Sequence, residues 1–231
     1  MRVSLEPAYV LHSRPYRESS VLLEALSPNH GRVGLVARGA RGARSRWKGV
    51  LQPFRPLLLS WSQRGELATL TGADQVAAPP MLVGESLFCA IYANELLVRF
   101  LQRSDPHPGL FERYRRMLGQ LAAAEPTQPI LRLFEYHLLS AAGFGLELDQ
   151  ESGSDRALSA DAWYLYQPDF GAIRREREAG ESAGLVSGAA LLALKSGSIE
   201  DRHLRELKTL MRRLIRFHLG DRAIHSQQFF S

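Results

Sequence analysis

The chain has 231 residues, of which 45% are hydrophobic and 23% charged, and its formal net charge is +5 at pH 7. This composition is typical of a folded globular protein and excludes the intrinsically disordered class. Its single cysteine, Cys89, excludes a disulfide within the chain and a multi-cysteine zinc site. The first residues do not resemble a signal peptide and no 18-residue apolar run follows, so we expect a cytoplasmic protein without a membrane segment.

The first 80 residues predict short β-strands. Five apolar runs, each bounded by turn-forming residues, cover residues 8–13, 20–27, 32–38, 56–61 and 66–72. Five short strands with a longer connection between the third and fourth are typical of an OB-type barrel. We therefore predict an OB-type nucleic-acid-binding domain over residues 1–80.

After residue 80 the apolar residues recur at helical spacing. Three helices of roughly 15 residues are expected within 84–103, 109–124 and 129–145, because the breaks between them contain prolines. A last helix is expected to begin at Ser198, with Asp201 as its capping partner, and to end at Gly220.

Between the third and the last helix lies an acidic insert, residues 146–180. Its aromatic stretch at 163–173 is expected to form a short strand pair or an irregular segment. The predicted fold class is therefore α+β and multidomain, with a five-stranded OB-type barrel followed by a mainly α-helical domain, residues 81–231, without a zinc module.

The connection after the third predicted strand carries charge of one sign. No Asp or Glu occurs between Glu24 and Glu66, although that window contains eight Arg or Lys residues. Such a run indicates a polyanionic partner, because guanidinium groups match phosphate geometry and a tryptophan face stacks on unpaired bases. The alternative is a solvated basic loop with Trp47 packed inwards. The candidate DNA-binding residues are Arg32, Arg38, Arg41, Arg44, Arg46, Trp47, Lys48 and Arg55.

The last predicted helix carries a second basic face. Residues 201–231 hold 7 Lys and Arg against 3 Asp and Glu, whereas residues 146–200 hold 5 against 10. Four of these cations, spaced three and four apart, share one helix face, which is either a second DNA contact or a solvated surface. They are Arg205, Lys208, Arg212 and Arg216.

No set of residues suggests catalysis. The Gly-rich segment lacks the Gly-Lys-Ser/Thr ending of a phosphate-binding loop, and the seven histidines show no metal-ligand spacing. Because no nucleophile, base and orienting group can be assembled, we expect a non-enzymatic protein with no catalytic residues, no cofactor and no metal.

Six motifs occur in order over nearly the whole chain: RPYRESS (14–20), GRVGLVARGAR (31–41), LQPFRPL (51–57), YANELL (92–97), LRLFEYHLLSAAGFG (131–145) and HSQQFF (225–230). Together they resemble the RecO family of recombination mediators. The resemblance implies an N-terminal OB domain and a helical domain. Many family members carry a four-cysteine zinc module after the GFG sequence, but this chain has no cysteine there.

The resemblance also implies an activity and partners. These are binding of single- and double-stranded DNA, annealing of complementary strands, and indirect help in loading a RecA-type recombinase on DNA coated by single-strand binding protein. It implies two protein partners, RecR and the acidic C-terminal tail of the single-strand binding protein. It also implies association with the nucleoid. An RNA-binding OB module and a non-catalytic protein-interaction scaffold are the alternatives.

In the family, the tail of the single-strand binding protein docks on the helical domain. Such a tail needs a cation for its carboxylate and an apolar pocket for its aromatic residue. On this basis Arg132 is the candidate cation, and Arg115 and Arg116 are weaker candidates. The apolar candidates, for which a place in the core is the alternative, are Leu131, Phe134 and Leu138.

Overall fold

The computed structural model describes residues 1–176, 184–220 and 222–226. The parts of the predicted insert at 177–180 and of the HSQQFF motif at 227–230 lie outside the described residues. The chain forms two compact units: the first comprises Met1–Glu125 and the segment that begins at Ile224, and the second comprises Pro126–Ala223. The predicted domain boundary near residue 80 stays a prediction.

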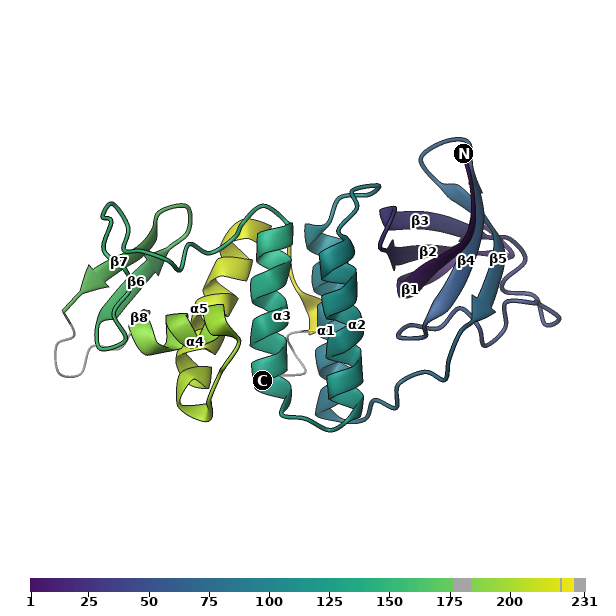
Figure 1. Cartoon of the computed structure of the whole chain (residues 1–231). Coiled ribbons are helices and arrows are strands. Elements are labelled where there is room, and N and C mark those ends of the chain that lie inside the picture. The colour runs from purple at the N-terminus through teal and green to yellow at the C-terminus, as the bar shows by residue number, and fades with distance from the viewer. Residues whose placement is uncertain (177–183, 221, 227–231) are drawn as a thin grey trace. The chain divides into compact units, whose positions relative to one another are not determined.

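The first unit contains a closed five-stranded barrel (Figure 1). Its strands are β1 (Arg2–Tyr16), β2 (Ser20–Ser27), β3 (Gly31–Ala37), β4 (Leu57–Gln63) and β5 (Ala68–Gln75). The strand order is β1-β2-β3-β5-β4, with β4 returning to β1, and only the β3–β5 pair among these neighbours is parallel. This closed Greek-key arrangement is the predicted OB-type barrel.

Strand β1 is much longer than the predicted run at 8–13. Its first half pairs with β4 and its second half with β2, so one strand closes the barrel. The pairing register shifts between Val3 and Glu6 and again between Val10 and His12, which lets the strand bend around the barrel. The first half escaped sequence analysis because exposed and buried residues are mixed there rather than forming an apolar run.

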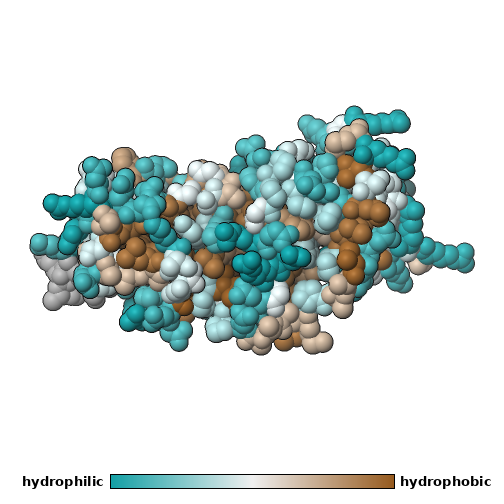
Figure 2. All heavy atoms as spheres, in the orientation of Figure 1, coloured by the Kyte–Doolittle hydropathy of each residue, from teal (hydrophilic) through white to brown (hydrophobic). Residues whose placement is uncertain are grey.

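The barrel interior is filled by fully buried aliphatic and aromatic side chains, including Val10, Leu23, Leu35, Leu59 and Trp61. On the face seen in Figure 2, hydrophilic side chains extend from the barrel into solvent. The division between an apolar interior and a polar exterior follows from the alternating directions of side chains along each strand.

Two helices pack on this barrel, α1 (Glu85–Phe100) against β1 and α2 (Pro108–Ala122) against β2. Their contact is partly polar and fully buried: the Asn94 side chain donates to the Leu11 carbonyl at 2.9 Å and accepts from the Tyr114 hydroxyl at 2.6 Å. Burial raises the pKa of Tyr114 well above its ordinary value, so this hydroxyl remains a hydrogen-bond donor.

The β2–β3 turn needs a glycine. Gly31 has φ of 62°, and a Cβ atom there would lie 1.9 Å from the Asp105 carbonyl oxygen. The close approach is held by a hydrogen bond of 2.9 Å from the Ser104 amide to the Arg32 carbonyl. The linker between α1 and α2 is therefore fixed against the barrel by backbone contacts that no side chain at position 31 would permit.

The second unit combines three helices with a small antiparallel sheet of order β7-β6-β8. Its elements are α3 (Thr127–Ala141), β6 (Trp163–Gln167), β7 (Gly171–Arg175), β8 (Leu185–Ser187), α4 (Gly188–Ser196) and α5 (Asp201–Leu219). Helix α5 packs against α3 and α4. No helix in the described part of the chain is both long and apolar enough to cross a membrane.

Sequence analysis was incomplete in the second unit. The aromatic segment forms the strand pair β6–β7 and not an irregular segment. Helix α4 was missed: it is only nine residues long, and it is capped by the Ser187 hydroxyl, which accepts from the Ala190 amide at 3.2 Å. The predicted capping of the last helix by Ser198 and Asp201 was wrong, because Glu200 is the N-cap and its amide donates to the Nδ1 atom of His203 at 3.3 Å.

Candidate nucleic-acid interface

The connection between β3 and β4, residues 38–56, is called the basic loop. It begins as a series of tight turns, closed by backbone hydrogen bonds from Gly42 to Gly39, from Ser45 to Gly42 and from Lys48 to Ser45, at 3.0–3.3 Å. All five of its predicted phosphate contacts at 38–48 are solvent-exposed, namely Arg38, Arg41, Arg44, Arg46 and Lys48. The sequence therefore folds into a succession of turns that presents positive charge to solvent.

Trp47 fixes this loop to the barrel. Its side chain is only 6% exposed and belongs to the barrel core, and its indole N–H donates to the Arg38 carbonyl at 3.1 Å. The Arg46 guanidinium lies 4.1 Å from the ring centroid. The prediction that Trp47 stacks on a base is corrected, because its ring is buried and its polar atom is satisfied within the loop.

Two of the five cations also shape the loop. Arg41 donates its amide to the Ser19 carbonyl at 3.0 Å and its guanidinium to the carbonyls of Arg17 and Glu18 at 3.3 and 3.1 Å. Arg46 donates to the Thr71 carbonyl at 3.2 Å. Carbonyl oxygens carry no net charge, so these hydrogen bonds do not neutralise the positive charge of either guanidinium group.

None of the described carboxylates neutralises the basic loop. Within the described residues, none of the five cations has an Asp or Glu oxygen within ion-pair distance, and the side chains of Arg38, Arg44 and Lys48 make no hydrogen bond. An exposed, one-signed surface of this kind attracts polyanions, and its effect decreases as salt screens it.

The β1–β2 turn extends this surface, which sequence analysis missed. Arg41 ties the basic loop to the turn, where Arg17 is exposed, and Arg14, near the end of β1, is exposed as well. The Arg17 guanidinium lies 5.2 Å from the Tyr16 ring centroid, and Arg17 has a left-handed φ of 53°. The RPYRESS motif contained the signal, since two arginines flank a tyrosine before a turn, but only tertiary hydrogen bonds place it beside the basic loop.

Arg32 and Arg55, which flank the five cations at 38–48 in sequence, make different contacts from those five. The predicted DNA contact Arg32 is corrected: its side chain is 16% exposed, pairs with Glu24 at 2.7 Å and donates to the Leu101 carbonyl at 2.9 Å. Arg103 contacts the same carboxylate, so Glu24 serves two cations. Arg55 instead donates to two neutral amide oxygens, of Gln52 at 3.1 Å and Gln75 at 2.7 Å, and keeps its charge.

The predicted basic face of the last helix is present in the second unit. Arg205, Arg212 and Arg216 are exposed on α5 and Lys208 is partly exposed, and none forms an ion pair with a described carboxylate. Arg213 lies outside this face, because it donates to the carbonyls of Tyr166 at 2.6 Å and Gly184 at 3.2 Å. Burial lowers the pKa of Arg213.

The predicted tail-binding residues on α3 face the interior. Leu131, Phe134 and Leu138 are buried, in keeping with the alternative that they are core residues. The Arg132 side chain is 4% exposed and lies 2.8 Å from the Glu135 carboxylate, so it is not the accessible cation that was predicted. A helix with this apolar spacing must bury one face, and residues 131, 134 and 138 share that face.

The two remaining tail-binding candidates lie on α2 in the first unit. Arg115 and Arg116 are both exposed. Arg115 pairs with Glu112 at 2.6 Å, one turn earlier on the same helix. Such an exposed pair contributes little stability and leaves both arginines accessible to an acidic partner.

In the described part of the chain, no group of three or more His, Cys, Asp or Glu side chains is arranged to hold a metal ion. The site is therefore an OB-type barrel with an anchored basic loop whose cations have no carboxylate partner among the described residues. Among the residues discussed above, no nucleophile or general acid lies beside a group that could activate it. This arrangement suits binding of a polyanion through its phosphates.

Comparison with known proteins agrees with this description. The family model "Recombination protein O N terminal" matches residues 1–79, and "Recombination protein O C terminal" matches residues 82–228. The DNA repair protein RecO of Nitrosococcus oceani is 50% identical over 228 residues, covering 98% of this chain and 92% of that protein. That of Methylococcus capsulatus is 46% identical over 230 residues, covering 99% and 93%, and that of Coxiella burnetii is 42% identical over 229 residues, covering 98% and 97%. The chain therefore belongs to the RecO family of DNA repair proteins.

Proposed function

We propose that this chain is a non-enzymatic recombination mediator that binds DNA through its basic loop, anneals complementary strands and helps to load a RecA-type recombinase on DNA coated by single-strand binding protein. The observation that carries the proposal is the set of five exposed cations on the barrel without a carboxylate partner among the described residues. Family membership supports the DNA-repair context.

The proposed mechanism is electrostatic. Two complementary strands repel each other through their phosphates, and a positive loop lowers this repulsion while leaving the base edges free. Base pairing then supplies the specificity, because contacts to phosphate carry no sequence information. No covalent bond is formed or broken, so the proposal requires neither a cofactor nor a metal.

The proposed partners follow from the family. They are single- and double-stranded DNA, RecR and the acidic C-terminal tail of the single-strand binding protein, with a cytoplasmic, nucleoid-associated location. For the acidic tail, the exposed Arg115 and Arg116 on α2 are the accessible candidates, whereas Arg132 contacts it only if its pairing with Glu135 is exchanged.

Fluorescence anisotropy of a labelled single strand over a salt series tests the proposal. Five loop cations that each neutralise one phosphate predict a slope of log K against log salt of about −3.5, hence a loss of about 100-fold between 50 and 200 mM salt. Replacing Arg38, Arg41, Arg44, Arg46 and Lys48 by Ala should weaken binding and flatten this slope. The matched control replaces Arg205, Lys208, Arg212 and Arg216 on α5.

The outcomes separate the alternatives. A flatter slope only in the α5 variant would move the DNA site to the second unit, and tight binding of RNA in competition with DNA would favour an RNA-binding module. An absence of binding by the native chain at low salt, with partner binding intact, would favour an interaction scaffold. Circular dichroism of each variant checks that the fold is retained.

A further inference from the structure

The barrel carries an aromatic side chain that the proposed phosphate contacts do not use. The Trp, Tyr and Phe residues within residues 1–80 are Tyr9, Tyr16, Trp47, Phe54 and Trp61. Three of them, Tyr9, Trp47 and Trp61, are buried. Only Tyr16 and Phe54 are partly exposed, so these two rings are the ones that a nucleotide base can reach on the folded barrel.

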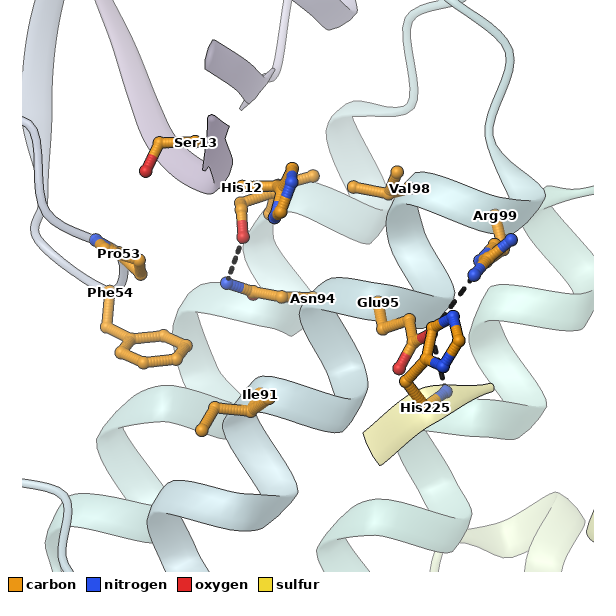
Figure 3. A pocket seen from close by; sticks show the side chains of 11 residues that line it. His12, Ser13, Pro53, Phe54, Ile91, Asn94, Glu95, Val98, Arg99 and His225 are labelled. Carbon is orange, nitrogen blue, oxygen red and sulfur yellow. Dashed lines mark hydrogen bonds and ion pairs between the residues drawn. The ribbon is translucent and has the colours of Figure 1, made fainter. Parts of the chain in front are cut away.

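Phe54 faces a different part of the first unit. Its ring is directed toward α1 (Figure 3), where it lines a pocket of about 630 Å³ together with Ile91 and Glu95. Glu95 accepts the His225 amide at 2.9 Å, the Ser226 amide at 2.8 Å and the Ser226 hydroxyl at 2.7 Å. Although partial burial of the carboxylate opposes it, these hydrogen bonds lower the pKa of Glu95. The Phe54 ring therefore faces α1 and an ionised carboxylate, which leaves Tyr16 as the accessible ring beside the cations.

Tyr16 lies at the end of β1, close to the start of the basic loop. It pairs with Ser20, the first residue of β2, and Val21 pairs with Ala37, the last residue of β3. Arg38 follows Ala37 and therefore lies beside the start of β2. Because neighbouring strands are about 4.8 Å apart, the backbones of Tyr16 and Arg38 are about 10 Å apart. Neighbouring nucleotides of one strand can span this distance.

Two cations flank the Tyr16 ring. The Arg17 guanidinium lies 5.2 Å from the ring centroid, and Arg14, two residues before Tyr16, is directed to the same face of β1. Both arginines are exposed, and neither forms an ion pair with a described carboxylate. Glu18 is the one carboxylate of the turn, and the two arginines outnumber it. The Tyr16 hydroxyl makes no hydrogen bond within the described residues, so polar contacts of the chain do not account for the ring's position.

The backbone of the β1–β2 turn is strained and held in place. Arg17 has a left-handed φ of 53°, which is uncommon for a residue other than glycine. Arg41 holds this conformation through its amide, which donates to the Ser19 carbonyl, and its guanidinium, which donates to the carbonyls of Arg17 and Glu18. Strain that the surrounding structure maintains in this way is typical of ligand-binding positions. The basic loop therefore fixes the part of the chain that carries the ring and its cation.

We propose that the Tyr16 ring and the Arg17 guanidinium form a stacking site for an unpaired base of the strand whose phosphates the basic loop binds. This inference rests on the proposed DNA binding and names the group that contacts the bases. OB-type barrels bind oligonucleotides through the connection between their first two strands, and stacking accepts any base because every base has a π-face. A stacked base keeps its pairing edge free, so the site holds one strand while leaving it able to pair with a complementary strand.

Strands with and without bases test the proposal. The full chain is titrated, by fluorescence anisotropy, with labelled oligothymidine and with an abasic strand of the same length. Tyr16→Leu keeps an apolar side chain but removes the ring, so it should weaken binding of oligothymidine about ten-fold. Binding of the abasic strand and the slope of log K against log salt should not change, because no charge is lost. Tyr16→Phe should keep the native affinity for both strands.

The matched control is Phe170→Leu, at a 70% exposed aromatic residue of the second unit, which should change neither affinity. Photo-crosslinking of the native chain to a strand that carries one iododeoxyuridine supplies a second measurement, and we expect the crosslink to map to Tyr16. Circular dichroism checks that each variant is folded.

Three results would overturn this inference alone: an unchanged affinity of folded Tyr16→Leu for oligothymidine, an equal loss for both strands, or crosslinks that map only to other residues. The equal loss would show that Tyr16 has a structural role. A native chain that does not bind oligothymidine at low salt would overturn the proposed function and this inference together.

Discussion

Replacing Trp47 distinguishes a core residue from a base-stacking residue. The indole is 6% exposed in the barrel core, donates to the Arg38 carbonyl and lies under the Arg46 guanidinium. Trp47→Ala should lower the free energy of unfolding of the barrel by about 3–5 kcal/mol, the range for removing a buried tryptophan. Within that total the hydrogen bond accounts for about 1 kcal/mol and the cation–π contact for about 0.5–1 kcal/mol.

Trp47→Phe is the more informative variant. It keeps a buried aromatic ring and loses the indole N–H, so we expect a cost of about 1–2 kcal/mol. The assay is urea denaturation followed by circular dichroism, with hydrogen exchange of β2 and β3 amides to report on the barrel itself. Phe170→Ala, at an exposed residue of the second unit, should stay within about 0.5 kcal/mol of the native chain.

The same variants are then tested for single-strand binding. If the indole is structural, Trp47→Phe retains the native affinity. A Trp47→Ala chain with native stability but an affinity about ten-fold weaker would refute the reasoning, because stacking on a base is worth about 1–3 kcal/mol per base. The indole would then have to leave the core in the DNA complex.

Three further predictions concern charge. Arg44→Gln should make the slope of log K against log salt for single-strand binding less negative by about 0.7, because the Arg44 guanidinium makes no hydrogen bond within the described residues and is available to one phosphate. An unchanged slope would show that Arg44 does not contact DNA. Glu24→Gln should lower the free energy of unfolding of the first unit by about 1–3 kcal/mol in denaturation experiments, because Arg32 and Arg103 lose their shared carboxylate. An unchanged free energy of unfolding would show that water replaces this carboxylate as the partner of both arginines. The lowered pKa of Glu95 means that its contribution to stability is fully present above the ordinary pKa of a glutamate and is lost as the pH falls through the lowered folded value. The protection factor of the Ser226 amide, which compares its exchange with the intrinsic rate at the same pH, should therefore fall on acidification. A protection factor that does not respond to pH in this range would contradict the hydrogen bonds from residues 225 and 226 to Glu95.

Much of the fold could be predicted because its local signals agree with its tertiary structure. Strand β2 coincides with the predicted run, and α1 to α3 lie where proline-bounded helical spacing places them. Helix α4 could not be predicted in the same way, because nine residues of small and aliphatic side chains show no amphipathic period. The first half of β1 was missed since its pairing with β4 connects residues 49 to 60 positions apart.

The candidate site was only partly predictable. Positive charge without nearby carboxylates is a property of the sequence, and the set of cations in the basic loop follows from it. Whether a given side chain faces solvent is not such a property. Arg32 and Arg44 belong to the same one-signed run, but Glu24 reaches Arg32 across the β2–β3 ladder at 2.7 Å and none of the described carboxylates reaches Arg44.

The sequence by itself indicated a polyanionic partner, a five-stranded OB-type barrel and the RecO family, because these depend on composition, spacing and motif order. Only the tertiary structure decided that Trp47 and Arg132 are buried, that the β1–β2 turn joins the basic loop, and that Glu95 holds residues 225 and 226. The physical reason is that burial and hydrogen bonding depend on which distant segments meet. The sequence around Glu95 and around Ser226 gives no indication that the two residues form a hydrogen bond. Only in the folded chain does the Ser226 hydroxyl lie 2.7 Å from a Glu95 carboxylate oxygen.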